Sequence, residues 1–446
     1  MLSDTIVALA TPPGRSALAV IRLCGADAFE VAGRVIDGFS PDPPRHATLA
    51  GFMDAAGEII DRGIYLAFPG PQSYSGDDTV ELTCHGGTTV AGRLVAALEA
   101  AGARPAHPGE FTRRAVLHGK LDLIQAEAVG DLVDATAPAQ ARAAVHQLEG
   151  GLSRRLERLR EDLIEVQALL GYDIDFPEED EPPVSRETMA GRLEDVDRQV
   201  AQLLATSPAG ERVHDGAVVV LAGRPNVGKS SLFNTLLGVD RAIVTEVPGT
   251  TRDAIEAHTD FLGWPVRLVD TAGLRADAER IEQLGIEVSQ RYQQAADVVL
   301  LCAESGRDLA PDERALLDTP LPRGGLPVLV RTKADLTQTA SEGIPVSAVT
   351  GDGVDVLRKT VAERVFGDRI QLADLEPMLT RERHRRALGG AQEAMRQAAP
   401  HLEPEGDTVL AAHHVQEAVR ALDTLIGTVD IEEVLDRIFS SFCVGK

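Results

Sequence analysis

The spacing of apolar positions changes along the chain and divides it into regions. From Thr5 to about Lys120, apolar stretches at Leu18–Leu23, Gly63–Phe68 and Val80–Cys84 alternate with turns and one helical stretch, which predicts a compact α+β domain. Further on, apolar residues recur every three or four positions and share one stripe of a long helix. These residues are Leu152, Leu156, Leu159, Leu163, Val166 and Leu170. Such a stripe needs a partner helix.

An acidic segment at 173–181 follows, which we interpret as a solvated loop, and a second helix is predicted at 188–204. From Ala217 to about Phe366, short β-branched runs alternate with helical ones. This alternation is typical of a mostly parallel sheet with helices on both faces. We expect a domain boundary near Gly216.

The last part of the chain, from about Leu372, is again predicted to be helical. Four of its apolar residues share one helix face: Val415, Val419, Leu422 and Ile426. This face could cover the first apolar stripe, so we expect the α/β domain to be inserted into a helical one. Helices exchanged between two chains would bury the stripe equally well.

Length and charge exclude some classes of protein. At about 100–200 residues per domain, 446 residues suggest two to four domains and exclude a single small binding module. The formal net charge of −25 should repel nucleic acid except at local basic patches, of which Arg381–Arg386 is the densest. The four widely separated cysteines fit a reducing compartment, and no apolar run reaches the ~18 residues of a membrane span. We therefore expect a cytoplasmic protein.

A glycine-rich loop between a strand and a helix predicts phosphate binding. The sequence Gly223–Ser230, GRPNVGKS, has the spacing of a P-loop. Its glycines let backbone N–H groups turn toward phosphates, Lys229 reaches the β- and γ-oxygens, and the Ser230 hydroxyl ligates Mg²⁺. The residues predicted to bind nucleotide here are Asn226, Val227, Gly228, Lys229, Ser230 and Ser231.

Two further segments are predicted to respond to the γ-phosphate of the nucleotide. A strand ends in the sequence DTAG, where Asp270 can hold Mg²⁺ through water and the Gly273 N–H can contact the γ-phosphate. Thr251, in the sequence GTTRD, could complete the Mg²⁺ shell while the γ-phosphate remains, as in a switch segment. The predicted nucleotide-binding residues of these segments are Gly249, Thr250, Thr251, Asp270, Thr271, Ala272 and Gly273.

The base is predicted to be guanine. Asp335 can accept hydrogen bonds from guanine N1–H and the 2-amino group, Lys333 can cover the ring, and the Ser347–Ala348 backbone can donate to O6. If adenine bound in such a site, the buried polar groups would have no hydrogen-bond partners, so the site rejects adenine. Thr332 stands where asparagine is expected, so we expect a weaker nucleotide affinity.

The position after Gly273 lacks the water-orienting glutamine of many GTPases and carries Leu274. An apolar side chain cannot orient the attacking water. Hydrolysis must then recruit a partner, a cation or another side chain; the candidates in the chain are Glu279, Glu282, Arg275 and Arg280.

Motifs over nearly the whole chain resemble one family, the bacterial tRNA uridine-modification GTPases called MnmE or TrmE. They include GRPNVGKSS, PGTTRD, DTAGLR, the N-terminal TIVALATPPGRSALAVIR, HPGEFTRRA, KLDLIQAEAV and the terminal IFSSFCVGK. The resemblance implies a GTPase that acts with the flavoprotein MnmG (GidA) to add an aminomethyl or carboxymethylaminomethyl group to C5 of the wobble uridine of certain tRNAs. It implies a homodimer, a heterotetramer with MnmG and no membrane association.

The resemblance also implies cofactors and their residues. A 5-formyl- or methylenetetrahydrofolate would supply the one-carbon unit and bind Arg22, Glu81, Lys120 and Lys446. A K⁺ ion would take the place of an arginine finger, with Asn226, Thr245, Val247 and Thr250 as ligands, while Glu246 and Pro248 complete the same nucleotide-binding segment. Ser230 and Thr251 would ligate Mg²⁺. Glu282 would orient the attacking water, and Cys443 in the terminal CVGK would act in modification.

The sequence thus predicts a multidomain α/β plus α protein. We expect an N-terminal α+β folate-binding and dimerisation domain at 1–120, helical parts at 121–215 and 372–446, and an inserted Ras-like P-loop GTPase domain at 216–371. The alternative function is a GTP-dependent ribosome-assembly factor, or a conformational switch, without modification chemistry. An assembly factor of this kind often carries a basic RNA-binding module, which the sequence does not show.

Overall fold

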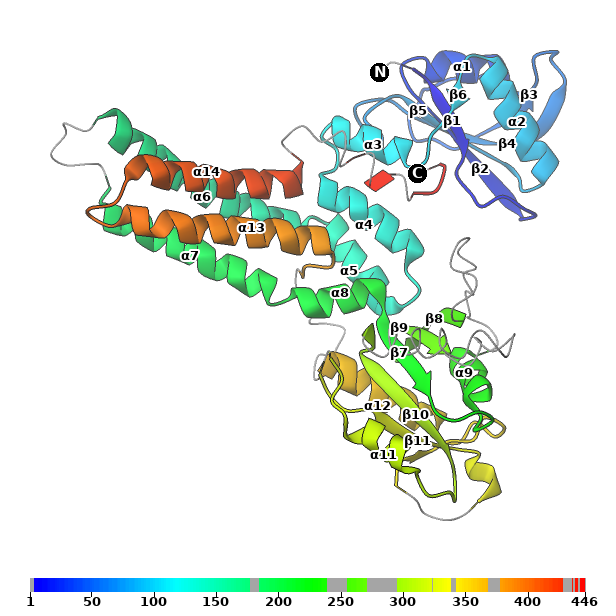
Figure 1. Cartoon of the computed structure of the whole chain (residues 1–446). Coiled ribbons are helices and arrows are strands. Elements are labelled where there is room, and N and C mark those ends of the chain that lie inside the picture. The colour runs from blue at the N-terminus through cyan, green and yellow to red at the C-terminus, as the bar shows by residue number, and fades with distance from the viewer. Residues whose placement is uncertain are drawn as a thin grey trace, which may run out of the picture. The chain divides into compact units, whose positions relative to one another are not determined.

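The computed structural model describes residues 4–176, 184–238, 255–270, 295–322, 324–337, 342–367, 378–427, 435, 438–439 and 442–445. They divide into two compact units (Figure 1). The first unit comprises Met1–Gly130, Ser153–Glu157 and Leu422–Lys446, and the second comprises Asp131–Leu152 and Arg158–Ala421. None of the helices in the described part of the chain combines the length and the apolar character that crossing a bilayer demands.

The first unit is built on a six-stranded sheet of order β3-β4-β5-β2-β1-β6. Its strands are β1 (Ile6–Leu9), β2 (Leu18–Cys24), β3 (Thr48–Met53), β4 (Ile59–Phe68), β5 (Thr79–His85) and β6 (Arg104–Pro105), with only the β1–β6 pair parallel. Helices α1 (Ala28–Val35) and α2 (Thr88–Ala100) pack their apolar faces on one side of the sheet. Helices α3 (Glu110–Leu117) and α4 (Leu123–Asp134) follow. The expected α+β fold is confirmed.

The helical part of the chain consists of long amphipathic helices. They are α5 (Pro138–Leu148), α6 (Gly151–Asp175), α7 (Arg186–Leu204), α8 (Ser207–Asp215), α13 (Glu382–Ala398), the 3-10 helix η5 (Ala399–Leu402) and α14 (Thr408–Ile426). Every member of the predicted stripe, from Leu152 to Leu170, is at most 1% exposed. Val415 and Leu422 of the second predicted face are also fully buried. Both apolar faces are therefore covered within one chain, without exchange of helices.

The acidic segment was wrongly predicted to be loop from its first residue. Helix α6 continues through Asp175 and ends at Phe176, because the residue before a proline disfavours helical backbone. Asp173 is held by Arg186 at 3.0 Å and by the Thr408 hydroxyl at 3.1 Å, which joins the end of α6 to the starts of α7 and α14. The rest of the predicted loop, from residue 177 on, lies outside the described residues.

Between the two helical parts, the second unit contains a six-stranded sheet of order β12-β11-β10-β7-β9-β8. Its strands are β7 (Ala217–Ala222), β8 (Ile255–Phe261), β9 (Trp264–Asp270), β10 (Val298–Glu304), β11 (Val328–Thr332) and β12 (Ile344–Pro345); only β8 is antiparallel to its neighbour. Among the described residues, helices α9 (Lys229–Leu237), α11 (Pro311–Asp318) and α12 (Val354–Phe366) and the short η2 (Ala334–Leu336) accompany it. The mixed, mostly parallel sheet of a P-loop domain is confirmed, and the carboxyl ends of β7, β9 and β11 lie at one edge.

Helix α8, which the sequence analysis did not predict, leads directly into β7. Its C-terminal His214 donates or accepts a hydrogen bond with Asp215 at 2.8 Å and one with Asp131 at 3.1 Å. Arg381, at the start of α13, also contacts Asp131. Burial by itself lowers the pKa of His214, but the hydrogen bonds to Asp131 and Asp215 outweigh it and raise the pKa to about 9. The positive imidazolium therefore links three helical segments where the sheet begins.

We expect His214→Gln to destabilise the protein in a pH-dependent way. Because the pKa of His214 in the fold lies above the usual histidine value of 6.5, the charged form stabilises the fold fully below about pH 6.5, and this contribution is lost as the pH rises through about 9. The variant should lose about 1–3 kcal/mol at about pH 6 and little at about pH 9.5. Thermal unfolding at both pH values measures this, with the exposed His146→Gln as control. An equal loss of stability at both pH values would contradict the positive charge assigned to His214.

Candidate functional site

The loop between β7 and α9 has the backbone conformation that phosphate binding needs. Gly223 has a φ of 134°, and a Cβ there would lie 2.3 Å from the Cys302 carbonyl oxygen, so only glycine fits. Asn226 and Gly228 also have positive φ angles, 59° and 98°. This geometry turns the loop over the N-terminus of α9, where backbone N–H groups attract anions. Beneath the loop, burial raises the pKa of the Cys302 thiol to about 12, which keeps it neutral.

Lys229 is the buried cation of this loop and is only 7% exposed. Its ammonium donates hydrogen bonds to the carbonyl oxygens of Gly223, at 2.9 Å, and of Arg224, at 2.7 Å. The charge is therefore held against the loop that would surround a phosphate chain. Val227 is buried beneath the loop, while Ser231, the third residue of α9, is exposed.

A hydroxyl and a carboxylate meet beside the loop. The Ser230 hydroxyl donates to Asp270 at 3.1 Å, and Asp270, the last residue of β9, is 2% exposed. Oxygen ligands of this kind suit Mg²⁺, which is bound in nucleotide sites by one or two protein oxygens together with phosphates and water. The structure thus brings together two of the three residues that the sequence analysis assigned to Mg²⁺; the third, Thr251, lies outside the described residues.

Thr332, which replaces the expected asparagine, fastens the P-loop to the sheet. Its hydroxyl donates to the carbonyl oxygen of Val227 and lies 3.3 Å from that of Ala303, and its side chain is buried. Lys333 adopts a φ of 55° and pairs with Glu304 at 3.2 Å. The hydroxyl therefore supplies a contact between the base-recognition segment and the phosphate loop.

The remaining residues predicted to recognise the base lie near this strand end. Asp335 is exposed in η2, as a carboxylate that reads a base must be. Ser347 is buried, and its hydroxyl accepts hydrogen bonds from the N–H groups of Val349 and Thr350, which fixes the turn that carries Ala348. The Ala348 carbonyl accepts from Thr235 of α9 at 3.4 Å.

Several predicted residues lie outside the described part of the chain. They are Thr245, Glu246, Val247, Pro248, Gly249, Thr250, Thr251, Thr271, Ala272, Gly273, Glu282 and Lys446, together with Leu274, Arg275, Glu279 and Arg280.

In the first unit, a second polar cluster contains two of the residues predicted to bind folate. Arg22 and Glu81 face each other on β2 and β5, and the Arg22 guanidinium donates to the Glu81 carboxylate at 2.7 and 3.0 Å. It lies 5.5 Å from the centres of the Tyr74 and Phe111 rings. It also reaches the Gly445 carbonyl at 3.5 Å, so the C-terminal tail lies beside this pair.

The tail is fixed by close backbone packing. Gly445 has a φ of 101°, and a Cβ there would lie 2.6 Å from the Leu9 carbonyl oxygen. Cys443 is exposed, and its carbonyl accepts from Gly109 at 3.4 Å. Lys120 donates to the Pro71 carbonyl in the β4–β5 loop at 2.9 Å, without a hydrogen bond to Arg22 or Glu81 among the described contacts.

Next to the tail, the first unit contains an apolar cavity of about 370 Å³. Val444 of the tail lines it together with Leu9 of β1, Pro12, Val95 of α2 and Pro105 of β6. This volume lies within the range of small-molecule sites. Tyr74, which the sequence analysis did not single out, covers Arg22 and donates to or accepts from Thr112 at 2.8 Å; no spacing pattern in the sequence points to it.

Comparisons with known proteins agree over the whole chain. The family model "MnmE helical domain" matches residues 123–443, and "GTP-binding protein TrmE N-terminus" matches residues 5–120. A protein of Nitrosomonas europaea named tRNA modification GTPase MnmE is 40% identical over 100% of this chain and 99% of its own length. A protein of the same name from Paramagnetospirillum magneticum is 43% identical over 100% of both chains.

Among solved structures, the G domain of the T. maritima FeoB iron transporter is 26% identical over 33% of this chain and 98% of its own, with a TM-score of 0.27. That score is too low to add to the assignment, which the family models and the full-length relatives support by themselves. The chain belongs to the MnmE family of tRNA modification GTPases.

Proposed function

We propose that this protein is a K⁺-activated GTPase that acts with the flavoprotein MnmG to modify C5 of the wobble uridine in certain tRNAs. The observation that carries the proposal is the edge of the second sheet, where the P-loop, Asp270 and Thr332 meet through direct hydrogen bonds. Family membership along the whole chain supports the link to tRNA.

In this proposal, the described residues bind and orient GTP. Lys229 would exchange its contacts with loop carbonyls for phosphate oxygens, and the N–H groups at the start of α9 would face the same charge. Ser230 and Asp270 would hold Mg²⁺, and Asp335 would select guanine. Mg²⁺ and K⁺ would supply positive charge against the charge that develops on the phosphates.

The cation replaces the missing glutamine only in part. Asn226 is the one proposed K⁺ ligand in the described part of the chain, and its exposed side chain, at a φ of 59°, can reach an ion beside the loop. Thr245, Val247 and Thr250 would complete the shell, Thr251 would join Ser230 at Mg²⁺, and Glu282 would orient water.

For the carbon chemistry, we propose that a tetrahydrofolate binds in the first unit. Arg22, Glu81 and the Gly445 carbonyl lie together, and the neighbouring cavity has room for an aromatic ring. Cys443 and Lys446 of the same tail would join them in this proposal. Lys120, which contacts the β4–β5 loop at Pro71, would join them. A cytoplasmic homodimer, joined by MnmG into a heterotetramer, and the domain limits at residues 120, 215 and 371 belong to the same proposal.

Steady-state GTP hydrolysis in K⁺ and in Na⁺ buffer tests the proposal. At equal ionic strength and fixed Mg²⁺, we expect hydrolysis to be at least about tenfold faster in K⁺, because Na⁺ is too small for a site built to replace an arginine finger. Asn226→Ala should remove most of this difference, whereas Asn234→Ala on α9 should keep it. Equal rates in both salts would exclude cation activation.

A further inference from the structure

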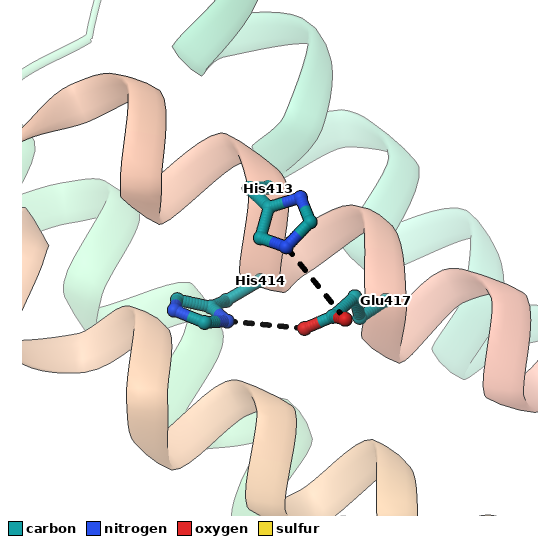
Figure 2. Close-up of side chains that lie close together, drawn as sticks. All are labelled: His413, His414 and Glu417. Atoms are coloured by element: carbon teal, nitrogen blue, oxygen red, sulfur yellow. Dashed lines mark hydrogen bonds and ion pairs between the residues drawn. The ribbon is translucent and has the colours of Figure 1, made fainter.

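Three side chains converge on α14, remote in sequence from every residue assigned above. Figure 2 shows His413, His414 and Glu417 with their polar atoms directed toward one another. The spacing explains this, since Glu417 lies four residues after His413 and three after His414, and both intervals place side chains on one helix face.

The distances match those between ligands of one metal ion. The nearest nitrogen of His413 lies 3.7 Å from one Glu417 oxygen, and His414 Nδ1 lies 3.1 Å from the other. One ligand atom from each residue falls within 4.8 Å of the other two. Bonds of about 2.0–2.1 Å in a tetrahedral shell place ligand atoms about 3.3–3.4 Å apart, so small side-chain rotations suffice.

The surrounding backbone holds this segment in place. Arg186 of α7 donates to the Gly406 carbonyl at 3.1 Å, just before α14, and to the hydroxyl of Thr408, the first residue of α14, at 2.5 Å. Gly406 packs so closely on the His401 backbone that a Cβ would lie 2.3 Å from its carbonyl oxygen. The His401 ring consequently stacks beside His414, with ring centres 6.1 Å apart.

We propose that His413, His414 and Glu417 bind one divalent transition-metal ion, with Zn²⁺ as the best-matched class. Zn²⁺ binds imidazole nitrogens and carboxylate oxygens, whereas Mg²⁺ favours shells made of oxygen alone. Two imidazoles and a carboxylate therefore suit Zn²⁺ better than Mg²⁺. Side-chain exposures of 56% for His413 and 46% for Glu417 let an ion enter from solvent. Three protein ligands leave a fourth position open to water, a substrate group or the neighbouring His401.

The test is a metal titration of the full-length, nucleotide-free protein with reduced cysteines and excess Mg²⁺. Zn²⁺ binding is measured by calorimetry, and Co²⁺ binding by its visible absorption. We expect one Co²⁺ whose spectrum lacks thiolate charge transfer, which excludes the cysteines as ligands. Removing a residue that only supports a metal ligand typically lowers metal affinity by about 10–100-fold. His413→Ala and Glu417→Gln remove direct ligands, so each should lower Zn²⁺ affinity at least that much.

The matched control is His146→Ala, which removes an exposed histidine from α5 and should leave the titration unchanged. Wild-type protein that binds no Zn²⁺ in this experiment, or a site whose affinity survives both His413→Ala and Glu417→Gln, would overturn the proposal. Retained thermal stability of each variant without metal shows that lost binding is not lost folding.

Discussion

Replacing Lys229 with alanine should reduce GTP hydrolysis by about 10²–10³-fold, the usual cost of removing one pre-organised donor aimed at developing charge. The lysine is buried in the phosphate loop, and its ammonium already points at the loop interior. GTP binding should weaken as well, because the ground-state β- and γ-phosphates lose the same cation. Steady-state kinetics and equilibrium titration with a GTP analogue measure the two effects separately.

Lys359→Ala is the matched control, since this lysine lies on α12 of the same sheet domain and 66% of its side chain is exposed. It should change neither rate nor affinity. The Lys229 variant also leaves two carbonyl oxygens without a donor, so its thermal unfolding must be compared with that of the wild type. A stable Lys229→Ala protein that hydrolyses GTP at the wild-type rate would exclude this loop as the catalytic phosphate site.

The phosphate site was predictable because its chemistry is local in sequence. A strand, a glycine-rich turn and a helix follow one another within Ala217–Leu237, and each requires particular residue types. The long helix α6 was predictable for a similar reason, since its apolar period is continuous. Its end was misplaced because acidic composition was read as loop, although Asp173 has partners from two other helices.

Contacts between residues that are distant in the sequence produce no spacing pattern from which they could be predicted. Helix α8 was missed because it is short and its second residue is a proline, which also suits a turn. Tyr74 lies in the loop that leads into β5, and it meets Arg22 of β2 because β5 and β2 are neighbouring strands of the sheet. By contrast, the sequence HHVQE at 413–417 contains the helical spacing of the proposed metal site and could have been found from the sequence.

Arg114 also makes contacts with residues that are distant in the sequence. Its environment predicts that replacing it has the largest effect on stability in the first unit. Its side chain is 1% exposed and contacts three carboxylates: Asp4 at 2.7 Å, Glu110 at 3.1 Å and Asp77 at 3.5 Å. It also donates to the Asp4 carbonyl at 2.8 Å. The guanidinium thus joins the segment before β1 to α3 and to the loop before β5.

Burial favours the neutral form of Glu110, but hydrogen bonds from Arg104, the His107 N–H and Arg114 together hold its pKa at about 2. Glu110 therefore stays charged in the fold at neutral pH. Without Arg114, this carboxylate keeps Arg104, whereas the basic group left within 4 Å of Asp77 among the described residues is the His118 imidazole, at 3.7 Å. Removing one member of a buried ion pair costs more than the pair contributes, because the other charge stays buried.

We therefore expect Arg114→Met, which nearly preserves side-chain volume, to destabilise the first unit by about 3–5 kcal/mol. Hydrogen exchange of full-length protein should show faster exchange in β1 and α3, while the P-loop domain exchanges as in the wild type. Arg15→Met, at an exposed position of the same unit, is the control and should change nothing. A loss below about 1 kcal/mol would mean that the three carboxylates find equivalent partners without Arg114, and that apolar packing alone fixes α3 against the sheet.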